Sequence, residues 1–316
     1  GRLSPATLHG YHRHVATDHR KPASILPPIV GLVWALSWLP VGYGCAQDTS
    51  KNEPPATALE VPPDSACGQA AALLGVVPCV HEVTTDAQWL ALAVPAGSPD
   101  VVRVSKYLVP ATEGAPATLF MNANVFTLHF DLLVQGFPDA YGGLTHAAYL
   151  DALLSPTDRE FYGGSLGEYV GSDGLTALFG FTLWEDTADP SAGVTKDEIV
   201  ATWQALSAVW ELGPLSWVPL GPRQEAVAQG WSDAPLPIGG TLGSELAYEG
   251  YNLHEGYGTV RRYSGSALHD AVDAGMLTFQ DIVVVDLAPV DIEAVVAGIV
   301  TGSRQGELSH LSVRSA

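Results

Sequence analysis

The sequence predicts a mixed α/β protein in which strands and helices alternate along the chain. Short runs of β-branched and aromatic residues have the length of strands, as in Val101–Val109. One amphipathic segment, Lys196–Leu212, repeats its apolar residues at helical spacing. Hydrophobic residues make up 47% of the 316 residues, so the chain can bury the cores of about two domains.

Further apolar runs predict the remaining strands. In Val125–Val134, aromatic and aliphatic residues alternate with polar ones, which places His129 on the face opposite the aromatic side chains. The other predicted strands are Thr118–Met121, Leu175–Trp184, Leu215–Leu220, Tyr257–Tyr263, Ile282–Leu287 and Ala297–Val300.

The clearest helix signal is at Lys196–Leu212. Thr195 and Glu198 have the spacing of a capping box at its start. Its apolar face predicts packing into the core and is formed by Ile199, Trp203, Leu206 and Trp210. Shorter helices are predicted directly after Thr145 and over Pro222–Gln229, Ser266–Ala274 and Asp291–Ala294.

Residues 1–46 predict an export segment. A basic stretch at residues 13–21 precedes the uncharged run Ile25–Tyr43, which prolines interrupt, so the pattern favours a cleaved secretory signal over a membrane-spanning helix. Small residues before Cys45 indicate a bacterial lipoprotein site, with Cys45 as the lipidated residue. Ordinary cleavage after Ala46 is an equal alternative, and a misassigned start of the reading frame is a third.

Residues 47–66 contain four prolines and many small polar residues, which predicts a disordered linker. The two cysteines that follow, Cys67 and Cys79, could close a disulfide loop in an exported protein, or remain as two buried thiols. No Cys/His spacing fits a zinc site, so we expect no metal centre.

The formal net charge of the chain is −20, and after Cys45 ten Lys and Arg remain against 33 Asp and Glu. Such a surface repels phosphate backbones, so nucleic acid is excluded as an expected partner. Adaptation of solubility to the surroundings is one reading of this charge, and a cationic partner is the other.

The segment Asp233–Gly240, rich in proline and glycine, predicts a linker between two domains. We therefore expect an α+β domain of unknown role over residues 67–238. A second domain then covers residues 239–316.

The candidate catalytic residues lie in residues 302–316, which follow a predicted strand. A glycine-bearing loop leads to Ser309 and His310, and Leu311 begins a segment that can form a helix. Neutral imidazole is a good nucleophile near pH 7 and can form a phosphoramidate. A helix N-terminus stabilises the phosphoryl group carried there. Ser309 could cap the helix or donate to the phosphoryl oxygens, and Arg314 could add a charged contact.

This constellation resembles a known family. Residues 309–314 (SHLSVR) are similar to the phosphohistidine motif of the glucan water dikinases, and more loosely to the swivelling domain of pyruvate phosphate dikinase and phosphoenolpyruvate synthase. Residues 281–286 and 297–301 resemble the strand–loop–strand before that histidine, and residues 252–258 resemble the start of the domain in exported bacterial relatives with a phosphoenolpyruvate/pyruvate-binding label. The resemblance implies an N-terminal α+β domain followed by an incomplete β/β/α swivelling phosphohistidine domain.

The sequence departs from the family in two respects. The family's Thr-x-Gly-Gly stretch is replaced by residues 303–307, where Gly306 can still let the backbone approach the phosphoryl group. The sequence also stops at Ala316, inside the domain, and the ATP-grasp domain expected to follow is absent from it.

The resemblance thus implies a fragment of an exported dikinase-like phosphotransferase, inactive by itself. In the intact protein, His310 would carry a phosphoryl group from the ATP-grasp domain, which binds ATP and Mg²⁺, to pyruvate, a glycan or another acceptor. The alternative is a non-catalytic exported lipoprotein that binds or scaffolds, since ATP is scarce outside the cytoplasm.

Other polar residues predict structural roles. His254 and Glu255 suit a turn entering a strand, and His146 and His269 suit the surface or the caps of short helices. Asp281 and Asp286 bracket a strand at a spacing that puts them on opposite faces, which argues against a carboxylate pair.

Overall fold

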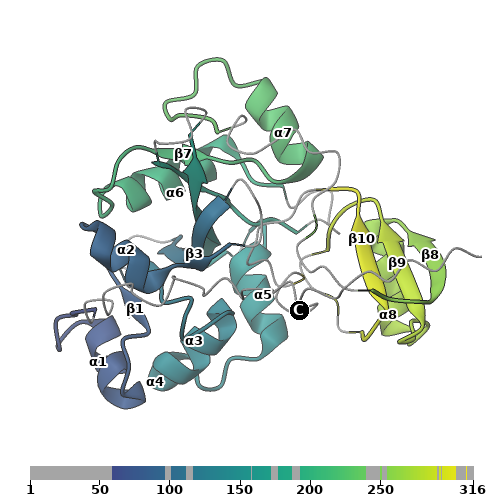
Figure 1. Cartoon of the computed structure of the whole chain (residues 1–316), viewed down its shortest axis with the longest axis horizontal. Coiled ribbons are helices and arrows are strands. Elements are labelled where there is room, and N and C mark those ends of the chain that lie inside the picture. The colour runs from purple at the N-terminus through teal and green to yellow at the C-terminus, as the bar shows by residue number, and fades with distance from the viewer. Residues whose placement is uncertain are drawn as a thin grey trace, which may run out of the picture. The chain divides into compact units, whose positions relative to one another are not determined.

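The computed structural model describes residues 59–96, 101–111, 117–157, 159–171, 177–186, 193–239, 250, 255–289, 292, 294–303 and 311. The fold is mixed α/β, as predicted, with a larger and a smaller sheet (Figure 1). The larger sheet is built from residues 59–239 and the smaller from residues 255–303. Each part is described by itself.

The larger sheet has seven strands in the order β1-β4-β3-β5-β6-β7, with β2 added beside β3. All neighbouring strands are antiparallel except the parallel pair β6 and β7. The strands are β1 (Cys79–Val80), β2 (Val94–Pro95), β3 (Val101–Pro110), β4 (Leu119–Met121), β5 (Phe161–Val170), β6 (Ala177–Phe181) and β7 (Leu215–Trp217).

Helices cover both faces of this sheet. One core combines side chains of α2 (Asp86–Leu92) and α6 (Lys196–Ser207) with one face, and α7 (Gly221–Gln229) packs at its margin. The other core combines α1 (Ala66–Leu74), α3 (His129–Gly136) and α5 (His146–Leu154) with the opposite face. The short helix α4 (Pro138–Tyr141) follows α3 directly.

The strongest helix prediction is confirmed in its capping. Thr195 and Glu198 form both bonds of the capping box at the start of α6. The helix ends at Ser207, earlier than the predicted Leu212, because the chain turns so that Trp210 can enter the core, where its ring lies edge-on to Trp89. Trp210 is therefore a core residue, as its spacing predicted.

The prediction of a strand over Val125–Val134 is wrong. Most of this segment belongs to α3, which begins at His129. The buried positions His129, Leu132, Leu133 and Gly136 recur at helical spacing, and packing on α1 and α5 selects this pattern over the alternation of period two. His129 is fully buried in this packing.

Two predicted linkers contain residues that pack in the fold. Leu59 and Val61, within the expected disordered linker, pack against buried residues of the larger sheet, so the folded part begins before Cys67. In Asp233–Gly240, Leu236 is buried, and the backbone N–H of Trp217 donates to the carbonyl of Pro237 over 2.9 Å. The segment up to residue 239 therefore extends the edge of the sheet at β7.

The smaller sheet has three parallel strands in the order β10-β9-β8, all at predicted positions. They are β8 (Thr259–Tyr263), β9 (Asp281–Val285) and β10 (Gly298–Thr301), and α8 (Gly265–Asp273) connects the first two. Leu268 of α8 packs on Val283 and Val285 of β9, which forms the core of this part. The helix predicted over Asp291–Ala294 is not seen at the described residues Ile292 and Ala294, which are not helical, and the other two positions lie outside the described residues.

Candidate functional site

The residues with the predicted phosphocarrier roles lie outside the described residues. These are His310, Ser309, Gly306 and Arg314, together with the predicted lipidation site Cys45 and with His254. The structure does describe Leu311, the residue after His310. Leu311 is helical, is 5% exposed and belongs to the core of the smaller sheet with Val283 and Val285.

The carboxyl ends of β9 and β10 are tied together where the chain leaves toward residue 310. The backbone N–H of Gly302 donates to the carbonyl of Val285 over 2.7 Å, and Oγ of Ser303 accepts from the N–H of Ala288 over 2.8 Å. A Cβ at Gly302 would lie 2.5 Å from the carbonyl oxygen of Asp286, so only glycine fits this approach. The end of β10 is thereby fixed against the end of β9.

Asp281 and Asp286 have unlike surroundings, as their spacing predicted. Asp281 is buried and its Oδ1 accepts from Nε of Arg261 over 2.6 Å, while its Oδ2 accepts from the N–H of Thr278 over 2.8 Å. The hydrogen bond from Arg261 holds the pKa of Asp281 below its usual value. Asp286 is exposed at the other end of the strand, so the two carboxylates do not form a catalytic pair.

The other histidines have structural surroundings. His129 lies edge-on to the ring of Trp184, and its Nδ1 is 3.4 Å from Oη of Tyr149. His146 begins α5 after the cap Thr145, as predicted, but its ring packs edge-on against Phe130, so it is half-buried rather than a surface residue. His269 is exposed on α8, as predicted.

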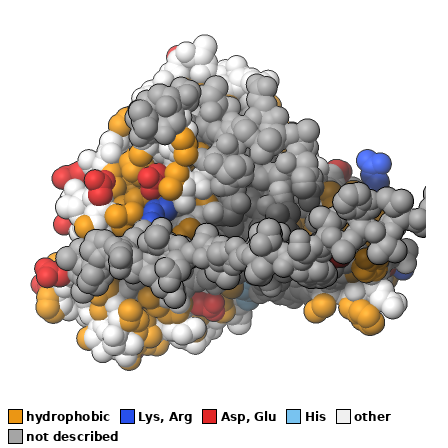
Figure 2. Space-filling view, in the orientation of Figure 1, with side chains coloured by type: hydrophobic (Ala, Val, Ile, Leu, Met, Phe, Trp, Pro, Cys, Tyr) orange, Lys and Arg blue, Asp and Glu red, His pale blue; other side chains and the backbone are white. Residues whose placement is uncertain are grey.

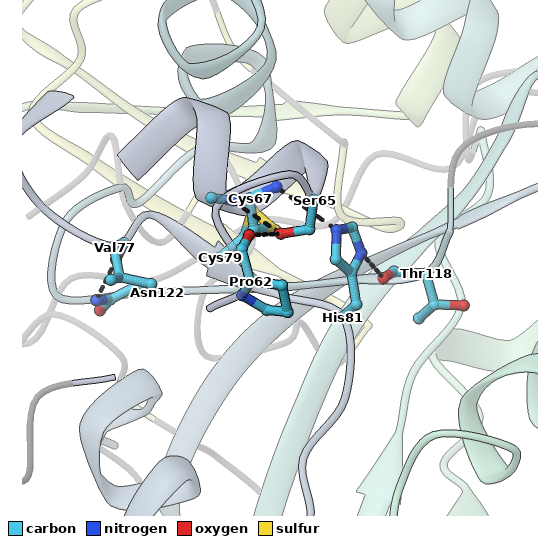
Figure 3. Close-up of a disulfide and its surroundings, with 9 residues drawn as sticks. Pro62, Ser65, Cys67, Val77, Cys79, His81, Thr118 and Asn122 are labelled. Atoms are coloured by element: carbon cyan, nitrogen blue, oxygen red, sulfur yellow. Dashed lines mark hydrogen bonds between the residues drawn. A yellow bond between two sulfur atoms is a disulfide. The ribbon is translucent and has the colours of Figure 1, made fainter. Parts of the chain in front are cut away.

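Cys67 and Cys79 are joined by a disulfide that links α1 to β1 (Figure 3). Both cysteines are fully buried. His81 lies beside the bridge, with Nδ1 at 3.0 Å from the carbonyl oxygen of Thr118 and Nε2 at 3.5 Å from the backbone nitrogen of Cys67. The bridge therefore fastens the first helix to the edge of the larger sheet.

On the face of the larger sheet that α3 and α5 cover, a row of cross-strand neighbours contains two polar residues, Lys106 and Ser165. Lys106 of β3 is paired with Met121 of β4 on one side and with Ser165 of β5 on the other. The backbone groups of Ser165 bond away from β3: its N–H donates to Oγ1 of Thr182 and its carbonyl accepts from the N–H of Thr182, each over 2.9 Å. Lys106 and Ser165 therefore form a non-hydrogen-bonded pair, in which opposite side chains lie closest.

Lys106 is fully buried within this row. Its Nζ donates to the carbonyl of Thr127 and lies 5.2 Å from the centre of the Trp184 ring. Burial lowers the pKa of Lys106 to about 7, although the charge of Asp131 acts in the opposite direction. The buried amine therefore loses its proton at a lower pH than an exposed lysine does.

Sequence reasoning missed this row. From the sequence, Lys106 is only one residue of a predicted strand, and β5, which carries Ser165, is not predicted because three glycines interrupt it. The available signal was a lysine in the apolar run Val101–Val109, since lysine is almost never buried without a partner.

Acidic side chains on the visible face are scattered among hydrophobic and polar ones and do not form one patch (Figure 2). Among the described residues, no helix is long and apolar enough to cross a membrane. Within the same residues, no three side chains of His, Cys, Asp or Glu are grouped so as to hold a metal ion. Comparison of the chain with protein-family models, with curated proteins and with solved structures found no match.

Proposed function

We propose that this chain is the phosphocarrier part of an exported, ATP-dependent phosphotransferase. His310 takes a phosphoryl group that originates from ATP and passes it to pyruvate, a glycan or another acceptor. The ATP, its Mg²⁺ and the residues that hold them belong to an ATP-grasp domain beyond the sequence described here. This chain contributes the imidazole and the sheet that presents it.

The observation that carries the proposal is the burial of Leu311 on the parallel sheet. Leu311 is helical and packs with Val283 and Val285, so the chain is anchored to β9 immediately after His310. On the other side, the hydrogen bonds of Gly302 and Ser303 fasten the end of β10. Ligands of α/β proteins bind at the carboxyl ends of parallel strands, and the carboxyl end of β10 is the end from which the chain continues toward His310.

The chemistry requires His310 to act as a nitrogen nucleophile. Its neutral imidazole attacks phosphorus, the bond from phosphorus to the donor oxygen breaks, and the phosphoryl group is held as a phosphoramidate. The same nitrogen is then the leaving group when the acceptor oxygen attacks. Ser309 would stabilise the negative charge on the transferred group by a hydrogen bond, and Arg314 by a charge-assisted contact.

Export is supported by the disulfide between Cys67 and Cys79, because such bonds persist in oxidising compartments. Together with the basic and apolar start of the chain, it favours the cell envelope, the periplasm or secretion. The lipid anchor on Cys45 is part of this proposal. Palmitate labelling of cells tests it: wild type should become labelled and Cys45→Ala should not.

The phosphocarrier role is tested with the protein produced from its complete reading frame. It is incubated with Mg²⁺ and with ATP labelled at either the β or the γ position, and the label on protein is followed. We expect a label that is lost in acid and kept in base, that His310→Ala abolishes and that His269→Ala leaves in place. Absence of label from both forms of ATP would leave the scaffold function as the better description.

A further inference from the structure

Large hydrophobic side chains are exposed at one end of the smaller sheet. Tyr257 is 88% exposed, Val295 79%, Phe279 69% and Met276 53%. Each lies in the segment that leads into β8, β9 or β10, so all four are near the amino ends of the parallel strands. Single exposed hydrophobic residues are common on protein surfaces, but a group of four at one end of a sheet indicates a binding surface.

Backbone hydrogen bonds bring these segments together. The N–H of Thr259 donates to the carbonyl of Gln280 over 2.7 Å, and the N–H of Ala297 donates to the carbonyl of Asp281 over 2.8 Å. The three segments that precede the strands are therefore neighbours. The exposed side chains that they carry belong to one surface, the amino-end surface of the smaller sheet.

Tyr257 is held outward by the two glycines beside it. A Cβ at Gly256 would lie 2.5 Å from the carbonyl oxygen of Ala297, and a Cβ at Gly258 would lie 2.2 Å from the carbonyl oxygen of Gln280. Only glycine fits these two close approaches. The backbone on both sides of Tyr257 thus packs on neighbouring segments, while its side chain projects into solvent.

An exposed arginine lies on the strand that follows Tyr257. Arg261 and Arg262 of β8 are the only Lys or Arg among the described residues of the smaller sheet and its connections. Arg261 bonds to Asp281, whereas Arg262 forms no salt bridge within the described residues. In a chain with a net charge of −20, Arg262 is thus a cation available to an anionic group beside the amino-end surface.

We propose that the amino-end surface docks on a bilayer of zwitterionic lipid. Tyr257, Phe279, Met276 and Val295 enter the boundary between head groups and acyl chains, and Arg262 contacts a lipid phosphate. The phenol of Tyr257 stays at the level of the head groups, where tyrosine is enriched in membrane proteins. Burial of apolar side chains together with attraction of a cation to lipid is how peripheral proteins bind this interface.

The shape and the charge of the surface favour a bilayer over a protein partner. The four apolar side chains are each more than half exposed and come from separate segments, so they project individually. A fluid bilayer accommodates such projections. A second copy of a chain with a net charge of −20 would be repelled, and so would a bilayer rich in anionic lipid. A zwitterionic bilayer offers phosphate to Arg262 without carrying a net charge.

Amide hydrogen exchange of the full chain with vesicles of phosphatidylcholine tests this surface. Exchange is read segment by segment, so it reports contact here whether or not another part of the chain also binds the vesicles. We expect vesicles to slow exchange in residues 256–259 and 277–281 and to leave the strands of the larger sheet unchanged. The double variant Tyr257→Ser, Phe279→Ser should lose this protection, because its two largest apolar side chains no longer enter the bilayer. Arg262→Gln should weaken it.

The matched control is the double variant Leu73→Ser, Leu90→Ser. Leu73 of α1 is 60% exposed and Leu90 of α2 is 48% exposed, so this variant removes exposed apolar side chains elsewhere on the chain. It should keep the protection by vesicles. Unchanged exchange in the larger sheet shows that each variant is folded.

The proposal is overturned if vesicles give no protection at residues 256–259 and 277–281, or if the variant of Tyr257 and Phe279 keeps it. It is also overturned if these segments become protected when the protein is concentrated without vesicles, which would mean that a second copy covers the surface. The surface does not involve His310 or Cys45, so none of these outcomes bears on the phosphocarrier proposal.

Discussion

Arg261 and Asp281 join the first two strands of the smaller sheet through a hydrogen bond of 2.6 Å from Nε to Oδ1. The same carboxylate accepts from the N–H of Thr278, so one buried side chain fastens β8, β9 and the turn before β9. Asp281→Asn should therefore loosen this sheet. We expect faster amide hydrogen exchange in β8 and β9 at pH 7, with the larger sheet unchanged.

The pH dependence of this effect has a definite sign. Because Arg261 lowers the pKa of Asp281 in the folded state, the stabilisation is complete above the unfolded pKa of about 3.9 and is lost as the pH falls below it. The difference in the free energy of unfolding between wild type and Asp281→Asn should therefore narrow below about pH 4. Asp286→Asn is the control, since Asp286 is exposed and its side chain accepts only from the N–H of Leu287 among described partners.

Because Lys106 is buried, we expect the protein to be less stable at neutral pH than at alkaline pH. The pKa of Lys106 is about 7 when folded and 10.5 in its usual state, so between these values the unfolded chain binds more protons and the free energy of unfolding rises with pH. The full rise is on the order of 5 kcal/mol. Urea unfolding in chloride buffers from pH 7 to 9.5 should show part of it in wild type.

Lys106→Met removes the titrating amine and keeps an apolar side chain of similar length. The variant should be at least as stable as wild type at pH 7, and the difference between them should shrink as the pH rises. A difference that stays constant from pH 7 to 9.5 would mean that Lys106 keeps its usual pKa in the folded protein.

Glu198 has two roles at the start of α6, and substitutions separate them. Its Oε2 accepts from the backbone N–H of Thr195 over 2.7 Å, and its Oε1 lies 3.5 Å from Nη1 of Arg159, whose side chain is 5% exposed. Thr195→Ala removes only part of the cap and should cost about 1 kcal/mol. Glu198→Gln leaves Arg159 buried without its counter-charge and should cost about 3 kcal/mol. Equal losses in urea unfolding would show that the ion pair contributes nothing beyond the cap.

The disulfide between Cys67 and Cys79 should stabilise the folded protein by restricting the conformations of the unfolded chain. The two cysteines are 12 positions apart, and closure of a loop of this size is worth about 3 kcal/mol. Replacing both cysteines by serine should lower the free energy of unfolding by about this amount. A reductant should then destabilise wild type and leave the double variant unchanged, and any equal response of the two would contradict the prediction.

The sequence was sufficient for elements whose local signal agrees with their packing. The β-branched run that became β3 and the capping box of α6 are examples. The prediction failed over Val125–Val134, where alternation and helical spacing coexist and contacts with α1 and α5 decide. It also missed β5, whose glycines weaken any strand signal but are needed because Leu153 and Tyr169 fold over them.

Residues whose signal is local in the sequence could likewise be recognised from it, whereas those brought together by strand pairing could not. The motif around His310 is local, so sequence alone could nominate it, and the burial of Leu311 anchors the chain at the next residue. The pair of Lys106 and Ser165 depends on two strands that are distant in sequence. A lone lysine in an apolar run signals burial, but only the strand pairing reveals which hydroxyl stands opposite it.

The central claim is that the imidazole of His310 becomes phosphorylated. The most direct measurement is mass spectrometric mapping of the phosphoryl group on the protein from the complete reading frame, after incubation with Mg²⁺ and ATP and digestion at alkaline pH. The account predicts an acid-labile gain of one phosphoryl group on the peptide containing His310, absent from His310→Asn. A phosphoryl group on another residue, or its persistence in His310→Asn, would contradict it.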